Sequence, residues 1–344
     1  PRRMIPESRR MPSTQPSVAV TGASGFVGRH LCQWLIERGY RVRGISRSGW
    51  DPGIPGLELV RLAGGARVAD LRSAFGGADA VVHLAARAHV LHEMSADAEA
   101  IYHTANVELT RLALHAAADT GCTRFVYSSS VKAVGEWSDR PWTEATPPRP
   151  ADVYGRSKLE AERVATEESR RLGLRTMILR FPAIYGPEMR ANMRRLFRTV
   201  DRGIPLPFAA VANRRSLLYV GNACAAIERS LITGLEGPEV FFVSDGHDVS
   251  TADLIRAVAG ALGRPARLFS VPSAAIRLAG RLGDRLAWMR RPPLTSSTVE
   301  RLLGSLQVDI SRIRALLGYT PPFTFEEGIR LTAEWFRSLD RNRA

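Results

Sequence analysis

Short apolar runs alternate with longer amphipathic segments over the first half of the chain. The apolar runs predict β-strands at 17–22, 40–46, 57–62, 79–86, 124–130 and 175–181. Segments with helical periodicity lie between most of them and predict helices at 25–39, 105–121 and 157–173. Repeated strand–helix–strand order predicts an α/β fold whose doubly wound parallel sheet carries helices on both faces.

The pattern changes after about residue 185. Proline and arginine become frequent, the apolar runs shorten, and amphipathic helices are predicted at 251–263, 273–289 and 325–339. We therefore expect a smaller, mainly helical C-terminal lobe. The expected organisation is then a disordered basic tail, a sheet domain, and a lobe from which about 216–244 returns to the sheet: 1–15, 16–187 and 188–340.

Composition and charge restrict the class of protein. With 45% hydrophobic and 24% charged residues, the chain reads as a soluble globular protein, and no apolar stretch reaches the ~18–20 residues of a membrane span. The net charge of +14 comes from arginines scattered along the chain, without a nucleic-acid-binding motif, so a basic cleft for a diphosphate-bearing small molecule is favoured over nucleic acid. Three widely spaced cysteines predict a cytoplasmic protein without a disulfide framework or metal site.

A glycine-rich turn follows the first predicted strand, in VAVTGASGFVGRHL (18–31). Gly22 permits a tight turn, Gly25 allows the backbone to approach a pyrophosphate, and Gly28 allows the helix to pack closely on the strand. The helix that follows points its positive end at the phosphates. The turn therefore predicts dinucleotide binding on a Rossmann-type sheet. Its other expected cofactor contacts are Ser24, Phe26 and Val27.

The end of the second predicted strand bears on the choice of cofactor. A carboxylate there would hold the ribose 2′-hydroxyl of NAD, and a basic residue would accommodate the 2′-phosphate of NADP. The chain offers Ser46 and Arg47 and no carboxylate, which slightly favours NADP(H) over NAD(H).

A run of serines and a tyrosine–lysine pair carry the candidate chemistry. The run 128–130 closes a predicted strand, and Tyr154 and Lys158, four positions apart, share one helix face. An unperturbed tyrosine has a pKa near ~10, and a neighbouring ammonium favours its phenolate. Lys158 is one of only two lysines among 48 basic residues, and the other is Lys132, close to the same serine run.

The motifs TGASGFVG (21–28), HLAA (83–86), SSS (128–130) and YGRSK (154–158), in this order, carry a family resemblance. From Val18 to about Phe336 the chain resembles the extended short-chain dehydrogenase/reductase family, specifically its NAD(P)-dependent nucleotide-sugar epimerases, dehydratases and 4-ketoreductases. The resemblance implies the fold predicted above, a homodimer, and the catalytic group Ser130, Tyr154 and Lys158.

The same resemblance implies further contacts. Cofactor contacts are expected, besides the catalytic group, from Leu84, Ala85, Ala86, Asn106, Ser128, Phe181 and Ala183. Contacts with the nucleotide sugar are expected from Arg87, Lys132, Asn192 and Arg215. Ala183 stands where the family usually has an asparagine, which weakens the expected side-chain contact there.

One branch of the family is disfavoured by the residues after the serine run. Sugar 4,6-dehydratases carry an Asp-Glu pair where this chain has Val131 and Lys132. Hydride transfer at C4 of a UDP-sugar is what remains. The first hypothesis is reduction of a UDP-4-keto-6-deoxy-N-acetylhexosamine in bacterial surface-polysaccharide synthesis, because 241–246 and 304–309 resemble that subgroup. The alternative is a UDP-sugar 4-epimerase, and a third is a non-catalytic, cofactor-sensing protein.

Overall fold

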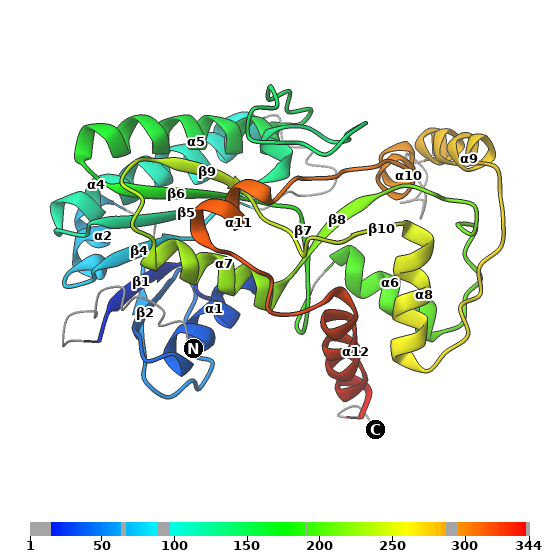
Figure 1. The fold of residues 1–344 in the computed structure, drawn as a ribbon, viewed down its shortest axis with the longest axis horizontal. Coiled ribbons are helices and arrows are strands. Elements are labelled where there is room, and N and C mark those ends of the chain that lie inside the picture. Colours follow the sequence, from blue (N-terminus) through cyan, green and yellow to red (C-terminus); the bar gives the residue numbers. More distant parts are fainter. Residues whose placement is uncertain (1–14, 63–66, 88–96, 190, 287–294, 342–344) are drawn as a thin grey trace, which may run out of the picture.

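A seven-stranded parallel sheet forms the larger part of the molecule (Figure 1). The computed structural model describes residues 15–62, 67–87, 97–189, 191–286 and 295–341, so the predicted tail, up to residue 14, lies outside the described residues. The strand order is β3-β2-β1-β4-β5-β6-β9. The bounds are β1 Ser17–Thr21, β2 Arg41–Ser46, β3 Leu57–Arg61, β4 Ala80–His83, β5 Arg124–Ser130, β6 Arg175–Phe181 and β9 Glu239–Phe242. The prediction of a Rossmann-type parallel sheet is confirmed.

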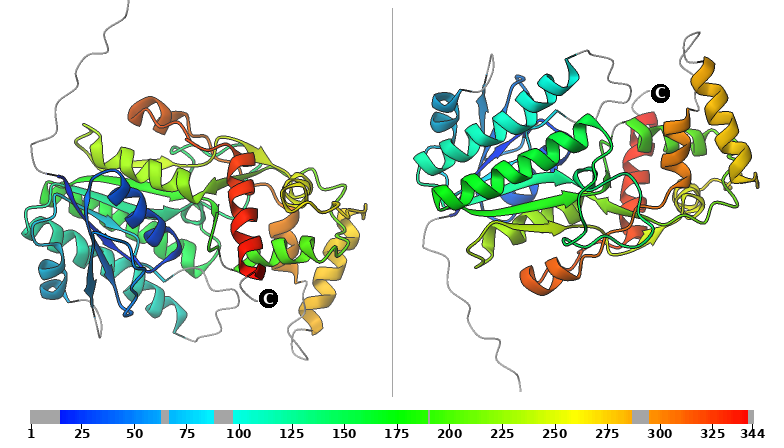
Figure 2. Two further views of the ribbon diagram at one scale, coloured as in Figure 1. Left: turned by 90° about the horizontal axis from the view of Figure 1, so that it is seen from below. Right: turned by 90° about the horizontal axis from the view of Figure 1, so that it is seen from above.

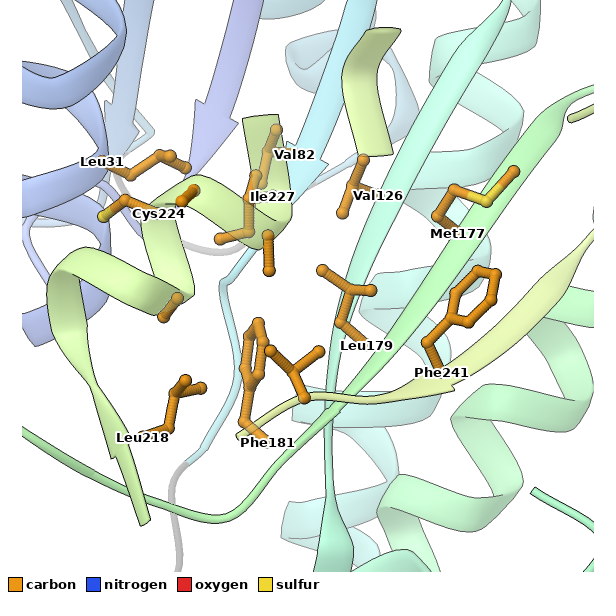
Figure 3. Packing of buried hydrophobic residues seen from close by; sticks show 14 of the residues in the cluster. Leu31, Val82, Val126, Met177, Leu179, Phe181, Leu218, Cys224, Ile227 and Phe241 are labelled. Carbon is orange, nitrogen blue, oxygen red and sulfur yellow. The ribbon is translucent and has the colours of Figure 1, made fainter. Parts of the chain in front are cut away.

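Alternate residues of the central strands β1, β4, β5 and β6 pack in two separate hydrophobic cores, as expected where both faces of a sheet are covered. Val18 and Val20 of β1 pack in one core, and Ala19 between them packs in the other. The first core lies beneath α1 (Phe26–Glu37) and α7 (Val220–Ile232) and is shown in Figure 3. The second core lies beneath three helices on the opposite face: α2 (Val68–Phe75), α4 (Leu109–Asp119) and α5 (Val153–Leu172). Figure 2 shows α1 and α7 on one face and α4 and α5 on the other.

Two helices differ from their predicted form. α5 begins at Val153, not at 157, because the carboxylate of Asp152 accepts a hydrogen bond of 2.7 Å from the backbone N–H of Gly155 and caps the helix. The predicted helix 105–121 is preceded by α3 (Ala98–Tyr102), and its first turn belongs to the π-helical turn η1 (His103–Glu108). π-turns inside helices often mark functional sites.

A smaller lobe, predicted from the change of pattern, lies beyond one end of the sheet (Figure 2). It holds a second sheet in the order β10-β8-β7, made of β7 (Ala183–Tyr185), β8 (Arg215–Tyr219) and β10 (Asp248–Val249). Its core includes Tyr185, Phe197 and Phe336. Its helices are α6 Ala191–Asp201, α8 Thr251–Leu262, α9 Ser273–Leu286, α10 Ser296–Leu303 and α12 Phe325–Arg341, and the short α11 Ser311–Leu317 lies near β9. Between β8 and α8 the chain returns to the large sheet through α7 and β9.

Candidate active site

The glycine turn connects β1 to α1 at the point where the strand order reverses direction, because β2 lies on one side of β1 and β4 on the other. Gly22 has φ +71°, and a Cβ there would lie 2.8 Å from the backbone nitrogen of Ala85. A Cβ on Gly28 would lie 2.3 Å from the carbonyl oxygen of Gly22. The turn therefore needs glycine at both positions, for the reasons that the sequence indicates.

The first turn of α1 fits an anionic group. Gly25 precedes the helix without a side-chain cap, and the first turn has no acidic residue. The N–H groups and the positive end of the helix dipole are thus left for a ligand such as a pyrophosphate. Ser24, Phe26 and Val27 are all partly exposed around this turn. The residues present at this turn fit the pyrophosphate of a dinucleotide.

The end of β2 keeps its predicted character. Ser46 is buried, and its hydroxyl donates a 2.7 Å hydrogen bond to the carbonyl of Ser48, while Arg47 is exposed. An exposed guanidinium is free to move towards a 2′-phosphate, but it is equally common on an arginine-rich surface. The preference for NADP(H) stays a prediction.

Tyr154 lies in the first turn of α5, beside the end of β5. Its hydroxyl forms a side-chain hydrogen bond with Ser130, the last residue of that strand. The Tyr154 ring meets the ring of Tyr102 edge-on, with 6.1 Å between the centroids. Burial raises the pKa of Tyr154 to about 12; the Ser130 hydrogen bond lowers it, and Asp152 and Tyr102 raise it. A nearby positive charge is therefore needed before this tyrosine can act as a base at neutral pH.

Lys158 is the nearest candidate for that charge, one helical turn after Tyr154. It is only 3% exposed, and its ammonium donates hydrogen bonds to the carbonyl of Ser128 at 2.7 Å and to the hydroxyl of Tyr127 at 3.2 Å. Burial lowers the pKa of Lys158 to about 7, and the carboxylate of Glu162 acts in the opposite direction. The structure thus brings the serine run and the Tyr154–Lys158 pair together at the carboxyl end of β5.

Sequence reasoning missed a buried ion pair behind this cluster. Glu162 accepts hydrogen bonds from the hydroxyl of Ser129 at 2.5 Å and from two nitrogens of Arg180, at 3.0 and 2.7 Å. The side chains of Glu162 and Arg180 are 5% and 6% exposed. The available signal was the spacing, because Glu162 lies four positions after Lys158 on the same helix face.

The segment after β4 is held by hydrogen bonds to its neighbours. The backbone N–H groups of Leu84 and Ala85 donate to the carbonyl and the hydroxyl of Thr21, both at 3.2 Å. Asn106, in the π-helical turn, accepts from the backbone N–H of Arg87 at 2.7 Å and donates to the hydroxyl of Ser157 at 2.9 Å. The predicted cofactor segment 84–86 is therefore braced between β1 and α5, and Asn106 provides part of the brace.

His83, at the end of β4, is a core residue. Its Nδ1 is 2.8 Å from the hydroxyl of Thr21, and burial lowers the pKa of His83 to about 3, so the imidazole is neutral. Its ring stacks on Tyr127, the residue whose hydroxyl accepts from Lys158. His83 therefore supports the site from behind as an uncharged side chain.

The residues predicted to contact the nucleotide sugar are spread over both parts of the molecule. The guanidinium of Arg87 lies 5.4 Å from the ring centroid of Tyr102, beside Tyr154. Lys132 directly follows Val131 in the 3₁₀ turn η2 (Val131–Ala133) after Ser130. The other two are Asn192, exposed on α6, and Arg215, which starts β8 and donates to Gly304 O at 3.0 Å. Two predicted cofactor contacts remain: Phe181, buried at the end of β6, and Ala183, exposed at the start of β7.

An open polar cavity of about 680 Å³ lies in the lobe, between segments 209–214 and 246–256. Arg214, Arg256, His247 and Asp248 are among the residues that line it. Its volume lies within the range of small-molecule pockets. In the described ranges, no three potential metal ligands gather in one place, and no helix is long and apolar enough to cross a membrane.

Comparison with known proteins places this geometry in a family. The model of the "NAD dependent epimerase/dehydratase family" matches residues 18–243. A "UDP-glucose 4-epimerase" from Vibrio cholerae is 35% identical over 97% of this chain and 98% of its own length. An "N-acetyl-alpha-D-glucosaminyl-diphospho-ditrans,octacis-undecaprenol 4-epimerase" from Escherichia coli O157:H7 is 27% identical over 93% of this chain and 95% of its own length.

Solved structures are also similar to this chain over nearly its whole length. The structure described as "MoeE5 in complex with UDP-glucuronic acid and NAD" is 26% identical, covers 94% of this chain and 99% of its own, and has a TM-score of 0.72. The structure of gox2253 is 25% identical, covers 95% of this chain and 99% of its own, and has a TM-score of 0.77. The sequence resemblance is thereby confirmed at the level of the family, and the chain belongs to the NAD dependent epimerase/dehydratase family.

Proposed function

We propose that this protein is a nicotinamide-dependent enzyme that acts at C4 of a UDP-sugar, and that 4-epimerisation is its reaction. The observation that carries the proposal is the contact of Ser130 with Tyr154 one helical turn before the buried Lys158. The likeness to the Vibrio cholerae 4-epimerase over nearly the whole of both chains supports the UDP-sugar and the position of the reaction. The homodimer and the cytoplasmic location stay predictions.

The roles of the residues follow from their positions. Tyr154 takes the proton of the C4 hydroxyl as the hydride leaves C4, and returns it when the resulting ketone is reduced. Ser130 hydrogen-bonds the same sugar oxygen, and Lys158 supplies the positive charge that favours the phenolate of Tyr154. A nicotinamide cofactor supplies the acceptance and return of the hydride. The glycine turn and the first turn of α1 would hold its pyrophosphate.

The preferred reaction at C4 differs from the one that the sequence suggested. Arg47 and the subgroup resemblance of the sequence favour a 4-ketoreductase. The Vibrio cholerae and Escherichia coli relatives, both named as 4-epimerases, favour epimerisation. Reduction of a UDP-4-keto sugar is the second candidate, because the end of β2 offers Ser46 and Arg47 and no carboxylate for the ribose of NAD.

Dehydration is not proposed. It needs two further carboxyl groups directly after the catalytic serine, and this chain has Val131 and Lys132 there. For the sugar nucleotide we propose Arg87 near the reacting end, and Asn192 and Arg215 in the lobe near the diphosphate. A guanidinium suits a diphosphate because it can form two parallel hydrogen bonds with it.

One assay separates the two reactions. The purified protein is incubated with UDP-glucose, UDP-N-acetylglucosamine, or a UDP-4-keto-6-deoxy-N-acetylhexosamine, while nicotinamide absorbance is recorded and products are resolved by NMR. A 4-epimerase interconverts C4 epimers without net change of cofactor, whereas a ketoreductase consumes one NAD(P)H per ketone. Absence of turnover with every UDP-sugar would refute the proposal.

Replacing Tyr154 by Phe tests the assigned base. We expect kcat to fall by about 10³-fold, within the range for general acid–base groups, while cofactor affinity stays within about threefold. Tyr319→Phe is the matched control, because Tyr319 is also a buried tyrosine and its hydroxyl donates to Asn222 O of α7 at 3.2 Å, not to a residue of the serine run. Turnover in Tyr154→Phe within tenfold of the parent protein would show that another residue moves the proton.

A further inference from the structure

We propose that Lys132 is a positioning residue: its ammonium holds the start of α5, and with it Tyr154, against the end of β5 that carries Ser130. This inference rests on the proposed function, because the proposed function makes Ser130 and Tyr154, which Lys132 supports, the catalytic pair. It replaces the expectation from sequence that Lys132 contacts the sugar.

The Lys132 ammonium is already engaged by two carboxylates. It donates to Asp152 Oδ2 at 2.6 Å and forms a second ion pair with Glu136. The three side chains are 18%, 29% and 15% exposed, so this cluster is only partly open to water. An ammonium with three N–H groups and two carboxylate partners has little left with which to bind a neutral sugar.

The same lysine connects directly to the catalytic serine. The backbone N–H of Lys132 donates to the hydroxyl of Ser130 at 3.2 Å, and that hydroxyl also contacts Tyr154. Lys132 therefore fixes Ser130 through its main chain and reaches α5 through its side chain. Its two connections converge on the two residues that must meet at the same sugar oxygen.

Asp152 is the connection to Tyr154. One of its carboxylate oxygens caps α5 by accepting from the backbone N–H of Gly155 at 2.7 Å, and the other accepts from the Lys132 ammonium. Gly155 lies so close to η2 that a Cβ on it would be 2.4 Å from the carbonyl oxygen of Lys132. The first turn of α5 is thus held against η2 by backbone contact on one side and by the ion pair on the other.

The charge of Lys132 also affects Tyr154. Burial is the largest cause of the raised pKa of Tyr154, and the hydrogen bond with Ser130 lowers it. Asp152, two positions before Tyr154, raises this pKa further. The ammonium of Lys132 offsets that negative charge at its source. The groups that interact with Tyr154 are Ser130 and Tyr127 from β5, Tyr102 from α3, and Asp152, which caps α5. Lys158 follows one helical turn later on the same face of α5.

Several other charged side chains of α5 form ion pairs with neighbouring elements. The pairs are Arg156 with Glu99, Glu162 with Arg180, and Glu168 with Arg111. Glu160 lies 3.2 Å from Nε2 of His103. The Lys132 ammonium, by contrast, pairs with the carboxylate that caps α5 just before Tyr154.

Lys132→Met tests the proposal, because methionine keeps the length of the side chain and removes its charge. We expect amide hydrogen exchange of segment 152–158 to become about tenfold faster, since the helix cap loses its anchor. We expect kcat with the UDP-sugar to fall about ten- to a hundredfold with KM within about twofold, because a small displacement of a catalytic group costs rate more than affinity. On the limb of the pH–rate profile where kcat rises with pH, the pH at which kcat reaches half of its maximum should move upward.

Arg156→Gln is the matched control. Arg156 lies in the same helical turn and is also ion-paired, with Glu99, but it is 49% exposed and does not reach η2. This variant should leave exchange and kcat within about twofold. Lys132→Arg should retain part of the activity, and Lys132→Met/Asp152→Asn should recover kcat to within about threefold of Asp152→Asn alone, because asparagine still caps the helix without an unbalanced charge.

The outcomes separate this proposal from the proposed function. Unchanged exchange of 152–158 in Lys132→Met, measured without any substrate, would overturn the positioning role whatever the enzyme's reaction is. A rise of KM alone, with kcat unchanged, would overturn it in favour of direct contact with the sugar. If the parent protein turns over no UDP-sugar, the proposed function fails. Faster exchange in Lys132→Met, but not in Arg156→Gln, would still show that Lys132 holds the start of α5 in place.

Discussion

Two buried carboxylates, one in each part of the molecule, are held in opposite ways. Glu162, on α5 in the sheet domain, is paired with the guanidinium of Arg180 through three hydrogen bonds. Asp245, in the loop after β9 where the large sheet meets the lobe, is held by neutral donors: the backbone of Tyr219, the amide of Asn222 and the hydroxyl of Tyr185, at 2.8, 2.7 and 3.0 Å. Among the described residues, no lysine or arginine pairs with Asp245.

The two carboxylates have different roles in the fold. The charge of Glu162 acts on the active site, because it raises the pKa of Lys158 one turn earlier on the same helix. Asp245 joins β8 to the start of α7 and to the tyrosine of β7, where hydrogen-bond acceptors are needed and a negative charge is not. Burial accordingly raises the pKa of Asp245 to about 6, against the effect of its donors.

The largest expected effect is on the ion pair. Glu162→Gln should lower the free energy of unfolding by about 3–5 kcal/mol at neutral pH, because Arg180 is left buried without its counter-charge. It should also lower the pKa of Lys158 further below about 7, so that less ammonium is present at neutral pH and the activity optimum moves to lower pH. Urea unfolding and a pH–rate profile measure the two effects.

The double variant Glu162→Leu/Arg180→Met is the control for this prediction. Removing both charges should recover most of the stability that Glu162→Gln loses, because no buried charge is left unpaired. Stability as low as that of the single variant would mean that packing, not charge, explains the loss.

The second effect concerns pH and has the opposite sign. The pKa of Asp245 is about 6 in the folded protein and 3.8 in an ordinary aspartate, so the folded state holds a proton that the unfolded state releases between these values. Its contribution to stability is therefore complete below pH 4 and is lost as the pH rises to about 6. The free energy of unfolding of Asp245→Asn, relative to that of the parent protein, should rise by on the order of 3 kcal/mol as the pH increases across that window. The change in urea midpoint measures this difference. A difference that does not depend on pH would show that Asp245 is ionised throughout.

The smallest effect sharpens the same contrast. Tyr185→Phe removes the hydroxyl that donates to Asp245 at 3.0 Å and should cost about 1 kcal/mol. Because this hydrogen bond lowers the pKa of Asp245, the loss should be greater above pH 6 than below pH 4. Equal losses at both pH values, again by urea unfolding, would place the carboxylate outside the reach of Tyr185 in solution.

Local patterns explain why the sheet domain could be predicted. The predicted strands lie within one residue of β1, β2, β3, β5 and β6. A parallel strand covered on both faces is mostly apolar, as β1 and β6 are, so it can be recognised from a short local run. Tyr154 and Lys158 could be placed together because four residues make one helical turn. The family motifs add the order in which these pieces meet.

The rest depends on contacts between distant segments. The three-stranded sheet pairs Asp248 with Ser216, and a bridge joins Arg215 to Leu306, so short strands are stabilised by partners far away in sequence. No local periodicity marks a strand of two residues such as β10. The ion pair of Glu162 and the engagement of Lys132 were missed for the same reason, since Arg180 and Asp152 reach them only in the folded chain.

The scarcity of lysine gives the protein an internal reporter. Both lysines lie beside the serine run, Lys158 3% exposed behind it and Lys132 18% exposed in front of it, and every other basic side chain is arginine. A sample grown with ¹⁵N-lysine would therefore show two side-chain ammonium signals, both from one site. Binding of a nucleotide or a sugar could be followed at two fixed points of the active site without attaching a probe to the protein, and the Lys158 signal would reveal directly whether its pKa of about 7 rises when a ligand enters.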